Sequence, residues 1–173
     1  MKYKVNEAIR ILERTPLVLK SLLSELDDSW IFNNEGAETW SPFDIVGHLI
    51  HGEKTDWLPR IKIILSDNDK HFHAFDRFAQ FEKSKGKTIN ELLSEFKILR
   101  IENIKLLQSF NISETDLEKT GIHPEFGLVT LRQHLSTWVV HDLTHLSQIT
   151  RVMAKQYKPE TGPWIKYFPK LEG

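Results

Sequence analysis

Three of the eight histidines lie in one stretch near the end of the chain, residues 130–153, with the sequence TLRQHLSTWVVHDLTHLSQITRVM. On a helix that advances by about 100° per residue, His134, His141 and His145 fall within roughly 40° of one another. His141 and His145 are one turn apart, so their imidazoles point the same way. Two imidazoles on adjacent turns of a rigid helix can bind one metal ion, so this HxxxH pair predicts two ligands of a metal site.

The histidines stand along one edge of an apolar helix face. That face consists of Leu131, Leu135, Trp138, Leu146, Ile149 and Met153. A half-buried edge suits a metal ligand, and it equally suits a core histidine with one hydrogen-bonded nitrogen, so both interpretations stay open for the pair. His134 is about 10 Å from His141 along the helix axis, too far to share an ion, and we expect it to make a hydrogen bond instead.

If the HxxxH pair is joined by one more histidine from elsewhere in the chain, the three imidazoles would leave at least one coordination position of the metal open, as in catalytic zinc sites. A divalent ion there could lower the pKa of bound water toward about 7. It could equally bind and deprotonate an incoming thiol. Nitrogen ligands admit zinc, nickel, iron, manganese or cobalt. Because the chain contains no cysteine, the thiol of the second route would be a diffusible cosubstrate.

A third ligand is available on a second expected helix, which carries His48 and His51. The apolar residues at 43–50 centre about 150° from each of them, so the helical wheel does not choose between the two. A solvated surface position is the simpler expectation for His51, and it stays open for His48 as well. The remaining histidines are expected in surface loops: His71, His73 and His123.

The chain has 173 residues, of which 23 are basic and 24 acidic, and a formal net charge of −1. This length predicts one domain, residues 1–173. The balanced charge lacks the basic excess that binds nucleic acid or an anionic membrane, so neither is expected as a partner. The absence of cysteine excludes disulfides and thiolate ligands. Charges interrupt the N-terminal apolar positions, so we expect no signal peptide or membrane span and a cytoplasmic protein.

The elements that would position these histidines are four amphipathic stretches with apolar residues at three- and four-residue steps. They span residues 5–26, 42–65, 88–110 and 130–153. Without convincing strand alternation, they predict an all-α four-helix bundle. Pro16 predicts a kink or a fresh helix start, and Pro59 a bend. Ser41, Thr88 and Thr130 are expected N-caps.

The connections carry their own signals. Residues 66–87 hold several aromatics, so this long connection is expected to pack over the bundle. Residues 113–116 predict one helical turn, and residues 121–127, GIHPEFG, predict a loop. Three prolines rule out a long helix in the tail from Lys158. Its aromatics are expected to pin it to the body: Trp164, Tyr167 and Phe168.

Three blocks carry a resemblance to a known family: WSPFDIVGHLIHGE, FDRFAQFEKSKGKT, and HPEFGLVTLRQHLSTWVVHDLTHLSQITRVMAKQY followed by GPW. Together they resemble the DinB superfamily over nearly the whole chain. A lone HxxxH is a weak signal, but combined with an early WSP…GH block it is specific. The resemblance implies an up-down-down-up bundle, with a long crossover between helices two and three. It also implies a metal site formed by His48, His141 and His145.

Members of this family are described as metal-dependent hydrolases or as thiol S-transferases that use bacillithiol or glutathione, and homodimers are common. The resemblance therefore implies a divalent-metal enzyme, either a hydrolase or a low-molecular-weight thiol transferase, that acts on a small-molecule electrophile. Family membership alone does not fix a reaction. A binding protein that holds metal without turnover, and a structural bundle with mutually satisfied core histidines, are the alternatives.

Residues around the triad have two interpretations each. Asp44 lies one turn before His48 and either orients that ring or serves only the helix start. Gln148 either lines a pocket or bonds a neighbouring helix. Aromatic residues either wall a pocket or belong to the core: Trp57, Phe75 and Trp138. Asp142 makes HDLTH formally similar to HExxH, but aspartate is one methylene shorter than glutamate, so we assign no catalytic base.

Overall fold

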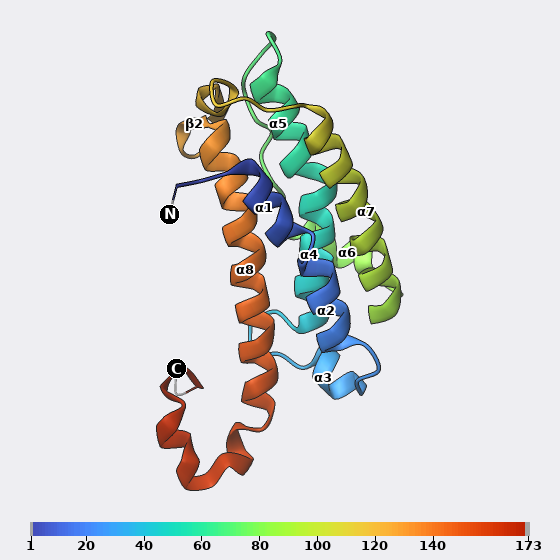
Figure 1. Cartoon of the computed structure of the whole chain (residues 1–173). Coiled ribbons are helices and arrows are strands. Elements are labelled where there is room, and N and C mark those ends of the chain that lie inside the picture. Colours follow the sequence, from blue (N-terminus) through green and yellow to red (C-terminus); the bar gives the residue numbers. More distant parts are fainter. Residues whose placement is uncertain (1, 172–173) are drawn as a thin grey trace.

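The structure is a computed structural model that describes residues 2–171. Long helices pack side by side in a bundle (Figure 1), which confirms the predicted four-helix-bundle fold. The bundle consists of α1 (Val5–Leu12) with α2 (Thr15–Leu23), α4 (Pro42–Thr55) with α5 (Trp57–Leu65), α7 (Ile89–Ser109) and α8 (Leu131–Gln156). The second and third bundle helices run in one direction and the first and fourth in the other (Figure 1), which is the up-down-down-up arrangement.

Two of the expected helices are divided by proline. Pro16 stands in the first turn of α2, where its missing N–H is not needed, so the fresh start is confirmed. The bend expected at Pro59 lies three residues earlier, at Asp56, which ends α4 and begins α5 with φ −113° and ψ −69°. The proline ring crowds the carbonyl four residues before it and offers it no N–H, so the break falls ahead of the proline.

The expected caps are confirmed and mark where three of the bundle helices begin. Each of α4, α7 and α8 starts with a capping box, in which two side chains bond each other's backbone N–H: Ser41 with Asp44, Thr88 with Glu91, and Thr130 with Gln133. Such a box satisfies backbone donors that have no partner inside the helix.

The connections differ from expectation in one respect. The stretch predicted as a loop at 121–127 is a hairpin of β1 (Thr120–His123) and β2 (Gly127–Thr130), preceded by η1 (Asp116–Glu118). Strands this short and rich in glycine show no usable alternation. The crossover packs over the bundle as predicted: it includes α6 (Ala79–Ser84), and its buried Phe72 donates an N–H to Ile122 O at 2.9 Å.

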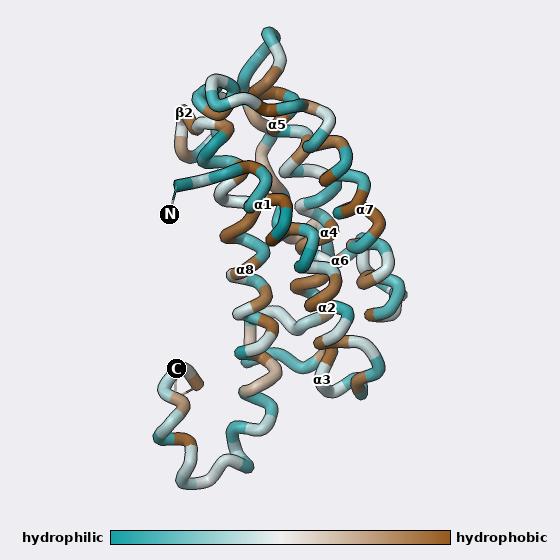
Figure 2. The backbone as a smooth tube through the Cα atoms, in the orientation of Figure 1, coloured by the Kyte–Doolittle hydropathy of each residue, from teal (hydrophilic) through white to brown (hydrophobic). Residues whose placement is uncertain are grey.

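The buried core is divided into two apolar clusters, and hydrophobic residues recur along the helices that form them (Figure 2). The first cluster includes Leu12, Trp57, Ile104 and Trp138. The second includes Leu19, Leu49, Phe96 and Ile149. A buried polar residue lies between the two clusters on each bundle helix: Thr15, Glu53, Arg100 and Asp142. We call these four residues the polar layer.

The tail departs from expectation. After α8 it forms η2 (Lys158–Tyr167) and η3 (Pro169–Leu171), which turn back beside the end of α8 (Figure 1). The absence of a long helix is confirmed, but the aromatic anchors are wrong: Trp164 is 66% exposed and Tyr167 78%. The short α3 (Asp28–Phe32) lies in the first connection. Within residues 2–171, no helix combines the length and apolarity needed to cross a membrane.

Candidate metal centre

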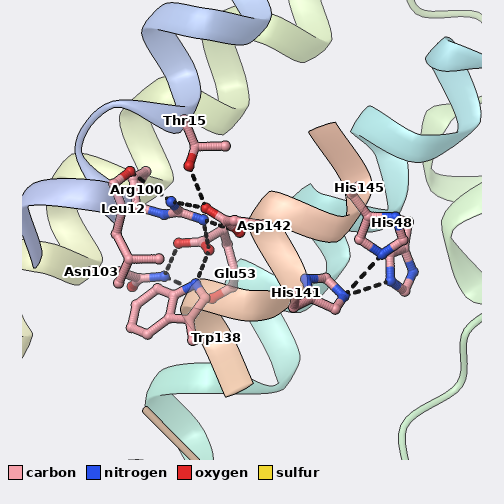
Figure 3. Close-up of polar contacts among 10 residues, drawn as sticks. All are labelled: Leu12, Thr15, His48, Glu53, Arg100, Asn103, Trp138, His141, Asp142 and His145. Carbon is pink, nitrogen blue, oxygen red and sulfur yellow. Dashed lines mark hydrogen bonds and ion pairs between the residues drawn. The ribbon is translucent and has the colours of Figure 1, made fainter. Parts of the chain in front are cut away.

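His48, His141 and His145 meet where α4 packs against α8. The Nε2 atom of His141 lies 3.0 Å from His48 Nε2 and 3.2 Å from His145 Nε2. One ring nitrogen from each histidine lies within 4.8 Å of the others. Figure 3 shows the three rings directed toward a common point from two helices. His48 and the HxxxH pair, which begins 93 positions later in the chain, therefore form one cluster of imidazoles.

The structure distinguishes His48 from His51, which the helical wheel could not do. His48 is 6% exposed and joins the cluster, whereas His51, 4% exposed, packs its ring 4.9 Å from that of Phe75. The Nδ1 atom of His51 accepts a hydrogen bond from Lys83 Nζ at 3.2 Å. The expectation that His51 is a solvated surface residue is wrong, because α6 and the crossover cover this side of α4.

The electrostatic environment keeps the three rings neutral. Burial, and to a smaller extent the neighbouring imidazoles, lower the pKa of His48 to about 3 and that of His141 to about 2. Burial also lowers the pKa of His145. Neutral imidazole is the form that binds metals, since the ligating nitrogen must keep its lone pair.

Hydrogen bonding selects the tautomer of one ring. His145 Nδ1 lies 2.8 Å from Gln148 Oε1, an oxygen that only accepts, so Nδ1 carries the proton and Nε2 faces the cluster as a lone pair. The Nδ1 atoms of His48 and His141 are buried without a hydrogen-bond partner among the described residues. Facing lone pairs repel one another unless a positive charge stands between them.

Two of the three nitrogen–nitrogen distances fit ligands of a shared cation. Metal–nitrogen bonds of about 2.0–2.1 Å separate two ligand nitrogens by roughly 2.9 Å at a right angle and roughly 3.4 Å at a tetrahedral angle. The two measured distances, 3.0 and 3.2 Å, lie between these values. Three neutral nitrogen donors in this geometry suit a divalent transition metal and leave room for a further ligand.

The cluster forms part of the wall of a cavity of about 600 Å³ between α4–α5, α8, the crossover and the hairpin. Its aromatic lining consists of Trp40, Trp57, Phe72, Phe75 and Phe126. Trp57 packs edge-on against His141 with ring centroids 5.0 Å apart, and Trp40 lies 4.9 Å from the His48 ring. The cavity is therefore largely apolar next to a polar, metal-compatible wall, as small-molecule sites usually are.

The other predicted residues divide into two groups. Trp57 and Phe75 line the cavity, which is the first of the two roles expected for them. Gln148 does not line this cavity and bonds His145 on its own helix, which is neither of the roles expected for it. Asp44 instead accepts from Ser41 N and Ser41 Oγ, with no contact to His48, so only its helix-start role is confirmed. Trp138 follows the core alternative: it is fully buried and does not line the cavity.

Apart from His51, the histidines outside the cluster follow the predictions except for His123. His134 Nε2 donates to Trp57 O at 3.1 Å, as expected of a hydrogen-bonded residue. His71 and His73 are exposed in the crossover, also as expected. His123 lies on β1, is half-buried and lines the cavity, so its assignment to a surface loop is wrong.

The polar layer lies next to His141, on the side of α8 away from the three imidazoles (Figure 3). Arg100, 1% exposed, donates to both Asp142 oxygens, at 2.6 and 3.1 Å, and to Glu53 Oε1 at 2.8 Å. Thr15 Oγ1 donates to Asp142 at 2.6 Å, and Trp138 Nε1 to Glu53 at 3.1 Å. Two carboxylates and one guanidinium give this layer a formal charge of −1.

Asp142 is therefore held by Arg100 and turned away from the imidazoles, which agrees with rejecting it as a base of HExxH type. Sequence reasoning missed Glu53, Arg100 and Trp40. A signal for Arg100 was present, because it interrupts the apolar series of α7 between Phe96 and Ile104. A charged residue in a core register normally has a buried partner.

Comparison with known proteins agrees with this description. A family model described as the DinB superfamily matches residues 11–149. A protein of Oceanobacillus iheyensis, provisionally named a metal-dependent hydrolase, is 23% identical over 153 residues, which cover 88% of this chain and 87% of that protein.

Solved structures share the fold. YfiT from Bacillus subtilis, described as a probable metal-dependent hydrolase with an unusual four-helix bundle topology, matches with a TM-score of 0.74 and 20% identity, over 94% of this chain and 90% of that one. TT2238, described as a four-helix bundle protein, matches with a TM-score of 0.52 and 20% identity, over 85% and 98%. Because the family model matches most of the chain, the protein belongs to the DinB superfamily.

Proposed function

We propose that the chain is a metal-dependent enzyme that acts on a small electrophile, with water or a low-molecular-weight thiol as the nucleophile. His48, His141 and His145 would hold one divalent ion. The observation that carries the proposal is the convergence of three neutral imidazoles in the wall of an apolar cavity. The names of YfiT and of the Oceanobacillus protein, both metal-dependent hydrolases by description, support it.

When bound, a divalent ion supplies a Lewis acid that makes a coordinated water or thiol more acidic. The protein's own residues prepare the site. Burial keeps the imidazoles unprotonated, and Gln148 holds His145 in the ligating tautomer. Trp40, Trp57 and Phe75 give the substrate an apolar wall that excludes bulk water, which strengthens electrostatic interactions inside the cavity.

The first test is metal content, with a matched pair of variants on one helix. His48→Ala removes a proposed ligand, whereas His51→Ala removes an equally buried histidine one turn away that faces α6 and the crossover. After loading with zinc and dialysis, the wild type and His51→Ala should hold about one equivalent, and His48→Ala far less. Equal metal content in the two variants, with the helical circular dichroism retained, would contradict the site.

The second test is turnover. The zinc-loaded protein is screened with an epoxide and an aryl halide in the presence of several small thiols, and with activated esters in their absence. We expect activity that is lost in His145→Ala. Product in the first screen identifies thiol transfer, and product in the second identifies hydrolysis. A variant as fast as the wild type would contradict catalysis at this site and favour a binding protein without turnover.

A further inference from the structure

The cavity has a second polar end, away from the histidines. His48, Gly52, Asp56 and Arg60 follow one another at four-residue steps along α4 and α5, and all four line the cavity. The opposite wall comes from α8, which runs antiparallel to α4 (Figure 1). The cavity therefore extends along the bundle axis, with the imidazoles at one end and Asp56 and Arg60 toward the other.

Asp56 and Arg60 form an ion pair inside this cavity. Arg60 Nη1 lies 2.7 Å from Asp56 Oδ1, and the two side chains are only 10% and 13% exposed for Arg60 and Asp56 respectively. Pairs with this spacing are common on helix surfaces, where both groups keep their water. Here both side chains have lost most of their water. A buried ion pair offsets the free energy of this desolvation only when further hydrogen bonds to the two groups are also made.

Those further bonds are absent on the aspartate side. Asp56 Oδ1 is buried and, although Arg60 is close, no donor among the described residues points at it with hydrogen-bond geometry. A carboxylate has room for about four hydrogen bonds. Burial raises the pKa of Asp56 to about 6 even though Arg60 opposes the shift, which is the behaviour of an anion short of donors.

Distance decides what Asp56 can do. Eight residues of helix at about 1.5 Å each place its Cα about 12 Å from that of His48, so it is neither a fourth ligand nor a group that touches the metal-bound end of a substrate. It can instead contact the other end of a molecule that spans the cavity. The wall beside it is Trp57, which extends the apolar surface toward His141.

We propose that Asp56 is a binding site for a protonated amine at the end of the substrate remote from the metal. This proposal depends on the proposed function only in assuming a metal ion at the histidine end of the cavity. An amine is favoured over a carboxylate on Arg60, because the guanidinium is already engaged: it donates to His73 O at 3.3 Å and lies over the Phe72 ring at 5.1 Å. An ammonium group brings the hydrogen-bond donors that Asp56 lacks and adds a second positive charge beside it.

The test uses probes of one length with different ends. Binding of octylamine, octanol and octanoate is measured by tryptophan fluorescence, since Trp57 adjoins Asp56, with both zinc-loaded and metal-free protein. We expect octylamine to bind about tenfold tighter than octanol in both forms, as for a charge-assisted hydrogen bond. In Asp56→Asn this preference should disappear. The matched control is Glu125→Gln, which alters another acidic residue of the cavity lining and should keep the preference.

A second series joins the two ends. With zinc-loaded protein, α,ω-aminoalkanethiols of four to ten methylenes should show tightest binding at one intermediate length, where the thiol reaches the metal and the amine reaches Asp56. Equal binding of octylamine and octanol by the wild type, or tighter binding of octanoate, would overturn the amine proposal without any variant. If octylamine is preferred but no thiol binds, the amine site stands and the thiol route at the metal fails.

Discussion

At the residue scale, burial affects the pKa of the buried histidines more than their hydrogen bonds do. His134 shows this outside the metal cluster. Its Nε2–H is bonded to Trp57 O, which favours the protonated ring, yet desolvation prevails and lowers the pKa to about 4. The folded state therefore holds this ring neutral at a pH where an unfolded histidine, with an ordinary pKa near 6.5, is charged.

The sign of the resulting pH dependence follows directly. Between about pH 6.5 and pH 4 the unfolded chain binds a proton at His134 that the folded chain does not, so stability present above this window is lost as the pH falls. We expect His134→Gln, which can still donate to Trp57 O, to reduce the loss between pH 7 and pH 4.5 by about 2 kcal/mol, since one pKa unit corresponds to about 1.4 kcal/mol.

Urea unfolding with a chelator present, at a series of pH values, measures this. His73→Gln replaces an exposed histidine and serves as the control, with a curve parallel to that of the wild type. If His134→Gln also runs parallel to the wild type, burial of that ring is not the source of the acid sensitivity.

At the element scale, the polar layer joins all four bundle helices across a plane where apolar packing stops. Arg100 on α7 bonds Asp142 on α8 and Glu53 on α4, and it also donates to Leu12 O at the end of α1. Because Asp142 adjoins His141 in sequence, the bonds that hold its side chain also restrain the rotation of α8 and so the direction of the imidazole.

Arg100→Met should lower the free energy of unfolding by about 3–5 kcal/mol, because it leaves two buried carboxylates without their cation. Arg10→Met, which breaks an exposed pair with Glu7, is the matched control and should cost no more than about 0.5 kcal/mol. Chemical denaturation gives both values.

Adding Glu53→Gln and Asp142→Asn to Arg100→Met should recover part of the loss, since the unpaired charges are then gone. Failure to recover any stability would mean that packing of the guanidinium between Phe96 and Trp138, whose rings lie 4.8 and 5.3 Å from it, accounts for the effect.

At the scale of the whole molecule, the bundle and the tail contribute unequally. The two apolar clusters and the polar layer lie in the part of the chain that ends with α8, and none of their members comes from η2 or η3. The tail aromatics Trp164 and Tyr167 are mostly exposed, whereas Tyr157, at the end of α8, meets Trp30 with ring centroids 4.8 Å apart.

A chain ending at Tyr157 should therefore have the same free energy of unfolding in urea as the full chain, within about 0.5 kcal/mol, because the removed residues bury little apolar surface. It should also retain metal binding, since the three histidines and Gln148 all precede the cut. A clear drop in stability would show that the tail packs on the body in solution, as its aromatic content first led us to expect.

The sequence by itself determined whatever depends on neighbours within a turn or two. Periodicity located the bundle helices, the capping boxes marked their starts, and the four-residue spacing of His141 and His145 fixed them as a pair, because helical geometry is local. The family resemblance added the order of the helices and named His48 as the third histidine of the site.

Only the tertiary structure decided the features that join distant segments. It buried both His48 and His51 and aimed only one of them at α8, and it paired Arg100 with carboxylates 42 and 47 residues away. It also enclosed Asp56 and Arg60 in a cavity and left the tail aromatics exposed. These outcomes depend on which helix faces meet and what covers them, and no short stretch of sequence carries that information, because packing is set by the whole chain at once.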